Sequence, residues 1–367
     1  MTVRVVQVSF HADTGRRSAD SLLSAWPTLP AVALAASRAG VTVTVVQRAH
    51  QDEIVVRQGV DFHFVDDMAR ASGRVIERVH SLAPDVVHIQ GLSDPRCVRQ
   101  LFRRMPGVPL LVQDHGAEVP TGWRAHAWRW AHRSLAGATF TAHEQAAPWK
   151  RAKVLRADLP VFEVLESSSD FTLGDRSEAR RRTQMFGEPC LLWTGRLDAN
   201  KDPLTMLAAF ERAAERLPDA RLWCCYGDAP LLDVVQRRIA ASAVLRERVV
   251  LLGTRPHQEL EHRFRAADFF VQTSHREGSG YSLIEALACG TTPLVTDIPS
   301  ARRIVGEAGS LSPVGDARSL AEAMMVWASR DISMLRAAAR ARFDAALTFD
   351  VVGRQLRHAY ESVWTEP

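Results

Sequence analysis

The chain alternates short runs of Val, Leu, Ile and Phe with stretches of helical hydrophobic period along most of its 367 residues. This alternation is typical of parallel βα units, because a strand that helices cover on both faces is apolar throughout. We therefore predict an α/β protein built from doubly wound parallel sheets. In the first half we expect strands at Val3–Ser9, Val41–Gln47, Asp61–Val65, Val86–Gln90, Pro109–Gln113 and Thr139–Thr141, with helices at Leu29–Ala39 and Gly73–Leu82.

The same rhythm returns after a polar, charged stretch from Glu166 to Arg182, which we interpret as a linker leading into a basic helix. We therefore predict two domains, the first over 1–168 and the second over 169–348. In the second we expect strands at Cys190–Thr194, Arg221–Tyr226, Val249–Leu252, Phe269–Gln272 and Thr292–Thr296, with helices at Pro203–Leu217, Leu231–Ala241, Gln258–Ala266, Ser282–Ala288 and Ser319–Ser329.

The composition argues against several classes of protein. No segment approaches the roughly 20 apolar residues that cross a bilayer, and the N-terminus lacks a basic segment and cleavage site, so we expect a cytoplasmic protein. The five cysteines show no metal-ligand spacing, which predicts small buried side chains and no metal site. The net charge of +4 suits anionic ligands or an anionic membrane surface, although a solvated exterior is the simpler interpretation, and no nucleic-acid partner is expected.

One candidate ligand loop lies in the string LLWTGRLDANKDP, after the strand expected at Cys190–Thr194. Asp202 is a good N-cap and Pro203 suits the first helical position, so a helix is expected to start there. Arg196 and Lys201 then lie near a helix N-terminus, which itself favours anions, and both side chains can bind phosphate. Taken alone, the string fits a surface loop with incidental charges equally well.

A second candidate loop lies in the string EGSGYSLIEALACG, after the strand expected at Phe269–Gln272. We expect a glycine-rich turn, a helix from about Ser282, and Gly290 as its C-terminal cap. Such a turn leaves free backbone N–H groups around Gly278–Leu283, and these amides together with the helix dipole can bind a phosphate.

Two carboxylates accompany this glycine-rich turn. Glu277 lies in the turn itself, and Glu285 lies in the following apolar helix, where an unpaired carboxylate would be costly. Carboxylates accept hydrogen bonds, so they suit the vicinal hydroxyls of a ribose or a sugar. Phosphate donors and hydroxyl acceptors in one loop indicate a nucleotide-sugar site.

These strings resemble the retaining glycosyltransferases of family 4. The resemblance is carried, in order and at the family's spacing, by GRL…K (Gly195–Lys201), PDARLWCCYGDAP, RVVLLGTRPHQEL, RAADFFVQTS and EGSGYSLIEALACG. It implies a GT-B fold, in which two Rossmann-like doubly wound domains face each other across a cleft. It also implies that a C-terminal helix, about 349–367, crosses back onto the first domain.

The resemblance implies roles for individual residues of the second domain. Arg196 and Lys201 would contact the donor diphosphate, Glu277 would face hydroxyls of the donor sugar, and Glu285 would hold the nucleotide ribose. The glycine-rich loop would contribute Gly278, Ser279, Gly280, Tyr281, Ser282 and Leu283, while Gly227, Gly253, Thr254 and Arg255 would line the base pocket, largely through their backbone.

In the first half, the string PDVVHIQG matches the family's fourth-strand motif, with Gln90 in place of a histidine often seen there. The string VQDHGAE places His115 where the family has an active-site histidine near the transferred sugar. The loop after the first strand has a single glycine where the family usually has a pair. Acceptor-side residues are expected at Gly15, Arg16, His88 and Asp114.

The sequence also bears on mechanism. No Asp-x-Asp occurs, so we expect no metal-bridged diphosphate and no cofactor other than the nucleotide sugar as co-substrate, with Arg196 and Lys201 supplying the positive field. The family implies transfer of a hexosyl-type group, with retention, to a hydroxyl of a sugar, glycan or lipid-linked acceptor, by front-face attack. We consider two roles for His115: it binds the sugar or stabilises charge, or it is a buried histidine with a purely structural role.

The segment WRAHAWRWAHRSL, Trp123–Leu135, is expected to form an amphipathic helix. We predict that one arc faces the core and that the opposite, basic arc is solvated. A sharper alternative is that the basic arc docks on an anionic membrane surface or a phosphorylated lipid acceptor, at the inner face of the membrane. The core arc comprises Trp123, Ala127, Trp128, Trp130, Ala131 and Leu135, and the basic arc comprises His126, Arg129, His132 and Arg133.

Two other functions stay open at this point. The protein could bind a nucleotide sugar without catalysis, or it could be a GT-B epimerase that rearranges the donor without an acceptor. A dinucleotide-dependent dehydrogenase is disfavoured because no G-x-G-x-x-G follows the first strand.

Overall fold

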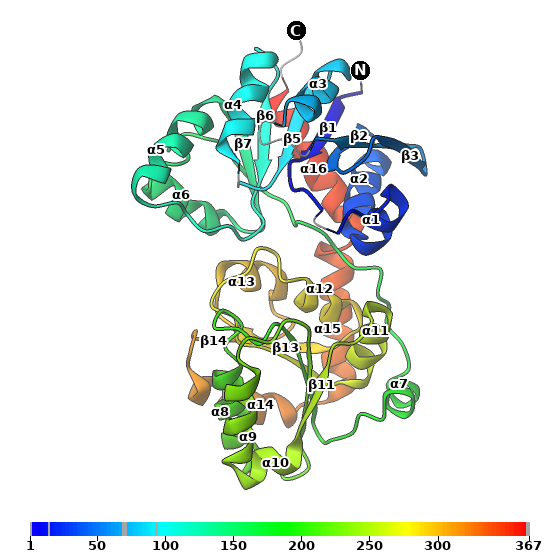
Figure 1. The fold of residues 1–367 in the computed structure, drawn as a ribbon. Coiled ribbons are helices and arrows are strands. Elements are labelled where there is room, and N and C mark those ends of the chain that lie inside the picture. The colour runs from blue at the N-terminus through cyan, green and yellow to red at the C-terminus, as the bar shows by residue number, and fades with distance from the viewer. Residues whose placement is uncertain (1, 14, 68–71, 93, 365–367) are drawn as a thin grey trace. The chain divides into compact units, whose positions relative to one another are not determined.

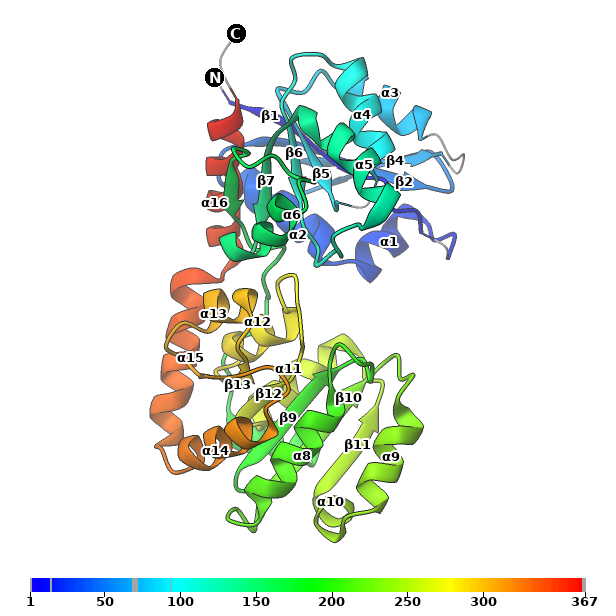
Figure 2. The same ribbon diagram turned by 90° about the vertical axis from the view of Figure 1, so that its left-hand side faces the viewer.

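A computed structural model describes residues 2–13, 15–67, 72–92 and 94–364. The chain divides into two compact units. Unit 1 comprises 1–168 together with 349–367, and unit 2 comprises 169–348 (Figures 1 and 2). Each unit is an α/β body with its own parallel sheet and its own hydrophobic core.

Unit 1 is built on a sheet whose eight described strands run in the order β3-β4-β2-β1-β5-β6-β7-β8. All neighbours are parallel except β3 and β4, which form an antiparallel hairpin at one edge. The strands are β1 (Arg4–Ser9), β2 (Thr42–Ala49), β3 (Glu53–Arg57), β4 (Val60–Asp66), β5 (Val86–Gln90), β6 (Leu110–Gln113), β7 (Leu135–Phe140) and β8 (Val161–Glu163).

Helices cover both faces of this sheet. On one face lie α3, α4 and α5, and on the other face α2 packs beside α16 (Figure 1). The helices of unit 1 are α1 (Ala19–Ala25), α2 (Thr28–Arg38), α3 (Gly73–Ser81), α4 (Pro95–Arg104), α5 (Gly122–Ala131), α6 (Ala147–Arg151) and α16 (Phe349–Val363), with 3-10 turns η1 (His132–Ser134) and η2 (His143–Ala146).

Unit 2 has a six-stranded sheet, all parallel, in the order β11-β10-β9-β12-β13-β14. The strands are β9 (Cys190–Gly195), β10 (Arg221–Tyr226), β11 (Val249–Gly253), β12 (Phe269–Gln272), β13 (Thr292–Thr296) and β14 (Ser310–Ser312). The helices are α7 (Arg176–Thr183), α8 (Pro203–Ala214), α9 (Leu232–Ala240), α10 (Ala243–Arg248), α11 (His257–Ala266), α12 (Tyr281–Ala288), α13 (Pro299–Val305), α14 (Ala317–Ala328) and α15 (Ile332–Ala346).

The prediction of two doubly wound parallel α/β sheets is confirmed. The predicted strands exist with shifts of one or two residues at their ends, except the strand expected at Thr139–Thr141, which is β7 and begins four residues earlier, at Leu135. Three short strands were not predicted: β3, β8 and β14. Strand β3 was not predicted because it is an exposed edge strand. Its residues Ile54 and Val56 are 57% and 62% exposed and do not form a buried run. Edge strands lack the two-sided burial that makes parallel strands recognisable from their composition.

The C-terminal helix α16 packs against α2 of unit 1, as the resemblance implied (Figures 1 and 2). The two helices approach closely at Gly353, where an added Cβ would lie 2.2 Å from the carbonyl oxygen of Ala35. Further along α16, the fully buried Tyr360 hydroxyl accepts a hydrogen bond from Gln7 Nε2 at 3.0 Å and pairs with His88 Nδ1 at 2.8 Å. Packing and a buried polar network therefore fasten the last helix to β1 and β5.

The cysteines are all free and buried, as predicted. Burial raises the pKa of the thiols of Cys97 and Cys190 to about 12, so neither ionises at neutral pH. Within the described residues, no helix has the length and apolar character needed to cross a membrane.

Candidate active site

The order of the sheet in unit 2 creates a switch point between β9 and β12. Strands β10 and β11 extend the sheet on one side of β9, while β12, β13 and β14 extend it on the other side. The loops that follow β9 and β12 therefore leave the same sheet edge side by side, which is where open α/β sheets bind ligands. The two motif loops predicted from the sequence are these two loops.

Three hydrogen bonds join the two loops. Thr273 Oγ1 donates to the carbonyl oxygen of Lys201 at 2.7 Å, and the amide of His275 donates to the carbonyl oxygen of Asn200 at 2.8 Å. Asn200 Nδ2 in turn donates to the carbonyl oxygen of Arg276 at 3.1 Å. These bonds fix the backbone of both loops, so the side chains they carry are held in position without a ligand.

An ion pair between Lys201 Nζ and Glu277 Oε1 links the two motifs. Both side chains are largely buried, at 19% and 13% exposed, and Gln272 Nε2 donates a second hydrogen bond to the same carboxylate oxygen at 3.0 Å. From the sequence, the ammonium is expected to bind the diphosphate of the donor and the carboxylate its sugar. The structure brings them into direct contact.

Two buried oxygen atoms beside this pair have no hydrogen-bond partner among the described residues. They are Thr194 Oγ1 at the end of β9 and Gln272 Oε1 at the end of β12. A buried polar atom without a partner is costly, so it usually marks a place where water or a ligand binds.

The second predicted cation, Arg196, has a different environment. Its side chain is 58% exposed and forms an ion pair with Asp198 Oδ2 at 3.0 Å. Asp198 Oδ1 also accepts the amide of Lys201 at 2.9 Å, so this carboxylate shapes the loop that carries both cations. Arg196 is therefore an exposed cation, whereas Lys201 is a largely buried one.

The glycine-rich turn leads into α12 as predicted, and Gly280 is its N-cap with a φ of +68°, a left-handed value that favours glycine. One prediction about this turn is wrong. The amide of Leu283 was expected to be free, but it donates to the carbonyl oxygen of Gly280 at 2.9 Å, because α12 already begins at Tyr281. Leu283 is buried, so its place is in the core and not on the ligand face.

Glu285 lies in the first turns of α12 and is only 8% exposed. Its Oε1 pairs with His257 Nε2 at 2.5 Å, and the imidazole ring of His257 stacks on Phe171 with ring centroids 4.9 Å apart. The hydrogen bond that His257 donates to the carboxylate of Glu285 raises the pKa of His257 despite its partial burial. His257 was not predicted, because a single histidine at the start of an amphipathic helix carries no pattern of its own.

The residues predicted to surround the base lie at the carboxyl ends of β10 and β11. Gly253 has a φ of +69°, and an added Cβ at Gly227 or Gly253 would meet no atom within 4 Å. Thr254 Oγ1 donates to the carbonyl oxygen of Tyr226 at 3.3 Å and so joins the two strand ends, while Arg255 is exposed. Both glycines therefore border open space.

In unit 1, His115 follows β6 and has both ring nitrogens engaged. Its Nδ1 lies 2.9 Å from Glu166 Oε2, and its Nε2 lies 3.0 Å from Gln90 Oε1. Burial opposes ionisation of the ring, but the hydrogen bond and the charge of Glu166 outweigh it and raise the pKa of His115. Glu166, 8% exposed, was treated as the start of a linker, so its role was missed.

The residues predicted for the acceptor side all lie in unit 1. His88 is the clear correction, because it is 0% exposed and binds Tyr360, so it fastens α16 and has no surface to offer an acceptor. Burial lowers the pKa of His88 to about 3, which keeps it neutral. Asp114 lies beside His115, and burial raises the pKa of this carboxyl to about 6. Gly15 and Arg16 lie in the exposed loop after β1.

The helix at Trp123–Leu135 is also a correction. It ends as α5 at Ala131, and the arc predicted to face the core is largely exposed, with Trp123 80% and Trp130 46% exposed. From the predicted basic arc, His132 is buried and burial lowers its pKa to about 4. Helical period defines the arcs of a helix, but the neighbouring helices decide which arc is covered.

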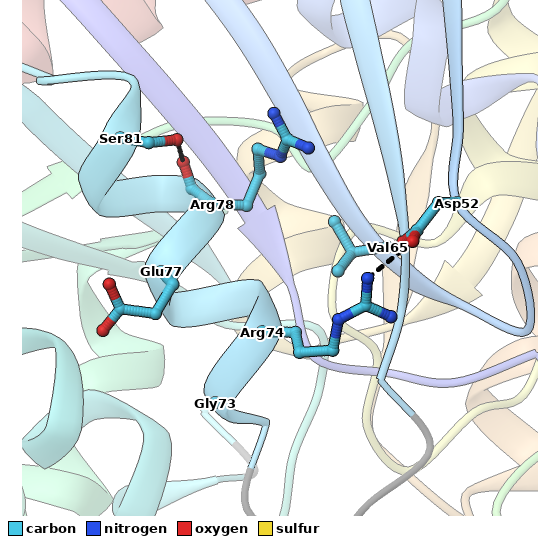
Figure 3. A pocket seen from close by; sticks show the side chains of 7 residues that line it. All are labelled: Asp52, Val65, Gly73, Arg74, Glu77, Arg78 and Ser81. Atoms are coloured by element: carbon cyan, nitrogen blue, oxygen red, sulfur yellow. Dashed lines mark hydrogen bonds and ion pairs between the residues drawn. The ribbon is translucent and has the colours of Figure 1, made fainter.

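A separate open hollow of about 460 Å³ lies beside α3 in unit 1. Figure 3 shows its charged lining: Arg74 pairs with Asp52 at 2.6 Å, and Arg78 comes from the next turn of the helix. Glu77 is bound by Arg104 at 2.9 Å. None of the predicted site residues lines this hollow.

Known proteins are similar to this chain in sequence and in fold. The family described as glycosyl transferases group 1 matches residues 175–343, nearly the whole of unit 2. Unit 2 of the chain therefore matches a glycosyltransferase family. The two loops joined by Lys201 and Glu277 lie inside the matched region.

Relatives of this glycosyltransferase extend the match beyond unit 2. A GDP-mannose:cellobiosyl-diphosphopolyprenol alpha-mannosyltransferase of Xanthomonas oryzae is 24% identical over 290 residues, which cover 76% of the chain and 74% of that protein. Among solved structures, sucrose-phosphate synthase from Thermosynechococcus elongatus superposes with a TM-score of 0.71 at 18% identity and covers 98% of the chain and 99% of its own. Anabaena HepE, solved with UDP and glucose, gives a TM-score of 0.68 at 15% identity, covering 98% and 100%. The fold of the glycosyltransferase is therefore GT-B.

Proposed function

We propose that the protein is a retaining, metal-independent glycosyltransferase of the family 4 type. It moves a hexosyl group from a nucleoside-diphosphate sugar to a hydroxyl of a glycan or lipid-linked acceptor. One observation carries the proposal: the largely buried Lys201–Glu277 pair lies at the switch point of unit 2, beside the N-terminus of α12. A cation can bind a phosphate, and a carboxylate can bind a hydroxyl. Because these two groups are held in contact, they suit a ligand whose phosphates and hydroxyls lie close together, as in a nucleotide sugar.

In this proposal Lys201 binds the donor diphosphate. An ammonium group has three N–H donors, so it can keep its bond to Glu277 while it donates to a phosphate oxygen. Arg196, which is more exposed, adds a second cation when the donor is bound. Because charge builds on the leaving phosphate as the sugar–oxygen bond breaks, cations that are already in place lower the barrier.

The nucleoside is proposed to bind at the neighbouring strand ends. Glu285 accepts hydrogen bonds from the ribose hydroxyls, and His257 positions its carboxylate. The base occupies the open space beside Gly227 and Gly253, where side chains would otherwise intrude. Glu277 accepts hydrogen bonds from the hydroxyls of the donor sugar.

The chemical step that we propose keeps the configuration of the sugar. The anomeric carbon–phosphate oxygen bond breaks, the acceptor hydroxyl attacks the same face, and its proton passes to the leaving phosphate oxygen. Both nitrogens of His115 are hydrogen-bonded, so the ring has no free lone pair for a base. His115 instead contributes a stabilising charge or a sugar contact, and its raised pKa favours the charged form.

We propose GDP-mannose as the first donor to test and a lipid-linked glycan as the acceptor class. The support is the Xanthomonas oryzae relative, whose name states both a GDP-mannose donor and a diphosphopolyprenol acceptor. UDP-glucose is the comparison donor, since HepE was solved with UDP and glucose. The reaction would then take place at the inner face of the membrane.

The test combines donor binding with product analysis. A thermal-shift screen of sugar nucleotides should give one clear response, because a ligand at 100 times its Kd stabilises the folded state by about 2.7 kcal/mol. The responding donor is then incubated with lipid-linked acceptors, with and without EDTA, and the anomeric linkage of the product is determined by NMR. Transfer with retention that EDTA does not reduce supports the proposal. Rearrangement of the donor without transfer would identify an epimerase instead.

A further inference from the structure

An exposed aromatic and basic surface covers helices α4 and α5 of unit 1, which lie side by side (Figures 1 and 2). We call it the α4–α5 patch. Large aromatic side chains that are exposed together on one surface of a domain indicate a site of interaction with another molecule. Its aromatic members are Phe102, Trp123 and Trp130, which are 43%, 80% and 46% exposed, and its basic members are Arg99, Arg103, Arg124 and Arg133.

The packing of α5 explains why its tryptophans point outward. The buried side of the helix is formed by Ala125, Ala131 and Trp128, and Trp128 stacks on Trp149 of α6 with ring centroids 5.8 Å apart. Since Trp128 faces α6, Trp123 and Trp130 lie on the other side of the helix, away from the core.

Two arginines of the patch lie close to the ring of Trp130. The guanidinium of Arg99 lies over the ring of Trp130, 2.9 Å from its centroid, and that of Arg103 lies at 6.0 Å. Among the described residues, none of the four arginines forms an ion pair with a carboxylate. The segments 95–113 and 119–143 contain no Asp or Glu at all. The patch therefore presents uncompensated positive charge beside exposed aromatic rings.

We propose that the α4–α5 patch docks on the surface of an anionic lipid bilayer. Tryptophan and phenylalanine rings enter the boundary between headgroups and acyl chains, and arginines bind the lipid phosphates. Each arginine near an anionic membrane surface strengthens binding by about fivefold, which corresponds to about 1 kcal/mol. The complementarity of charge selects an anionic membrane over a neutral one, and the exposed rings distinguish this surface from a solvated basic helix face.

The surface differs from the membrane contact that the sequence suggested. Two members of the predicted basic arc are engaged elsewhere: Arg129 donates to the carbonyl oxygen of Ala152 at 3.1 Å, and His132 is buried. The docking residues come instead from α4, from Trp123 and Trp130 of the predicted core arc, and from Arg124, and Arg133 is the one member of the predicted basic arc among them. The inference deepens the proposed membrane location and rests on it only for its biological setting.

Co-sedimentation of the full chain with vesicles tests the proposal without any sugar nucleotide. Two vesicle preparations are compared, pure phosphatidylcholine and phosphatidylcholine containing phosphatidylglycerol. We expect stronger binding to the anionic vesicles, and weaker binding at high salt because ions screen exposed charges. Binding can fail here while glycosyl transfer to a soluble acceptor persists, so the two proposals fail separately.

Variants assign the binding to the patch. The triple variant R103Q/R124Q/R133Q should bind anionic vesicles about 100-fold more weakly, on the fivefold value per arginine. Trp123→Ser should weaken binding to both vesicle types by roughly tenfold, the effect of removing one apolar side chain from the interface. The variant R318Q/M334S is the matched control, because it removes one exposed arginine and one exposed apolar residue from unit 2.

Each outcome decides the proposal. Equal binding of the wild type to neutral and anionic vesicles, or unchanged binding of the triple variant, would overturn it, as would an equal loss in the control. Self-association of the wild type that Trp123→Ser abolishes would overturn it as well, because the patch would then bind a second copy of the chain. Unfolding midpoints of all variants confirm that they fold.

Discussion

Units 1 and 2 share one order over six parallel strands, β4-β2-β1-β5-β6-β7 in unit 1 and β11-β10-β9-β12-β13-β14 in unit 2, but they build their polar sites in different ways. Each sheet has a switch point, between β1 and β5 in unit 1 and between β9 and β12 in unit 2. In unit 2, the polar residues lie on the two loops that leave this point, and hydrogen bonds between the loops hold them. In unit 1, the polar network draws on segments distant in sequence, including Glu166 and the C-terminal Tyr360.

Both units nevertheless pair a histidine with a buried glutamate. In unit 1 the atoms of His115 and Glu166 lie 2.9 Å apart, and in unit 2 those of His257 and Glu285 lie 2.5 Å apart. Both glutamates are 8% exposed, and both histidines have a raised pKa. The family strings point to the unit that we propose to bind the donor, whereas the histidine–glutamate pairs are visible only in the folded chain.

The first prediction separates the units by their effect on the donor. Lys201→Ala should lower kcat/KM at least 100-fold, or about 2.7 kcal/mol, because it removes a preorganised cation from the leaving group, and donor affinity should fall as well. His115→Ala should lower kcat but leave the donor Kd within about twofold, because the proposed contacts to the diphosphate, ribose and base of the donor lie in unit 2. Kinetics and calorimetric titration measure both.

An equal loss of donor affinity in the two variants would contradict the proposed difference between the units, since donor contacts would then not be confined to unit 2. Lys201→Ala also leaves the carboxylate of Glu277 without its ion-pair partner, and this can destabilise unit 2. The double variant K201A/E277Q controls for that effect. It should recover stability without recovering activity.

The second prediction tests whether the close packing of α16 on α2 stabilises unit 1. Gly353→Ala should lower the free energy of unfolding by roughly 1–3 kcal/mol, because the new methyl group would collide with backbone atoms of α2. Gly73→Ala is the matched control, since a Cβ there meets no atom within 4 Å. Urea unfolding followed by circular dichroism measures both. Equal stability of the two variants would show that α16 does not rely on this close approach.

The third and smallest effect concerns the two histidine–glutamate pairs. A histidine whose pKa is raised by folding stabilises the protein fully below its unfolded pKa, about 6.5, and this stabilisation disappears as the pH rises through the folded pKa. Glu166→Gln and Glu285→Gln should each lower the pKa of the partner histidine and flatten the fall in stability on the alkaline side. NMR titration of the histidine ring protons measures the pKa.

Asp85→Asn serves as a control for this measurement, because Asp85 pairs with Arg4 at 2.9 Å and with no histidine. A histidine pKa that stays raised in Glu166→Gln or Glu285→Gln would contradict the assigned cause. If the histidine pKa falls in only one of the two variants, the two pairs share their geometry but not the electrostatic effect of the glutamate on the histidine.

Much of the fold followed from the sequence, because parallel strands buried on two faces are apolar along their whole length. The loops of unit 2 were predicted for the same kind of reason, since Asp202, Pro203 and Gly280 specify local backbone geometry that does not depend on distant residues. The edge strand β3 and the exposed arc of α5 were missed, because burial depends on which neighbours pack against an element.

The sequence by itself determined the α/β class, the two sheets, the candidate donor loops and the resemblance to a glycosyltransferase family. These properties are encoded in hydrophobic period, capping residues and short motifs, which act over a few consecutive residues. The tertiary structure alone decided that Lys201 contacts Glu277, that His115 and His257 have glutamate partners, and that Trp123 faces outward. Contacts between segments far apart in the chain depend on sheet order and helix packing, and no local pattern specifies them.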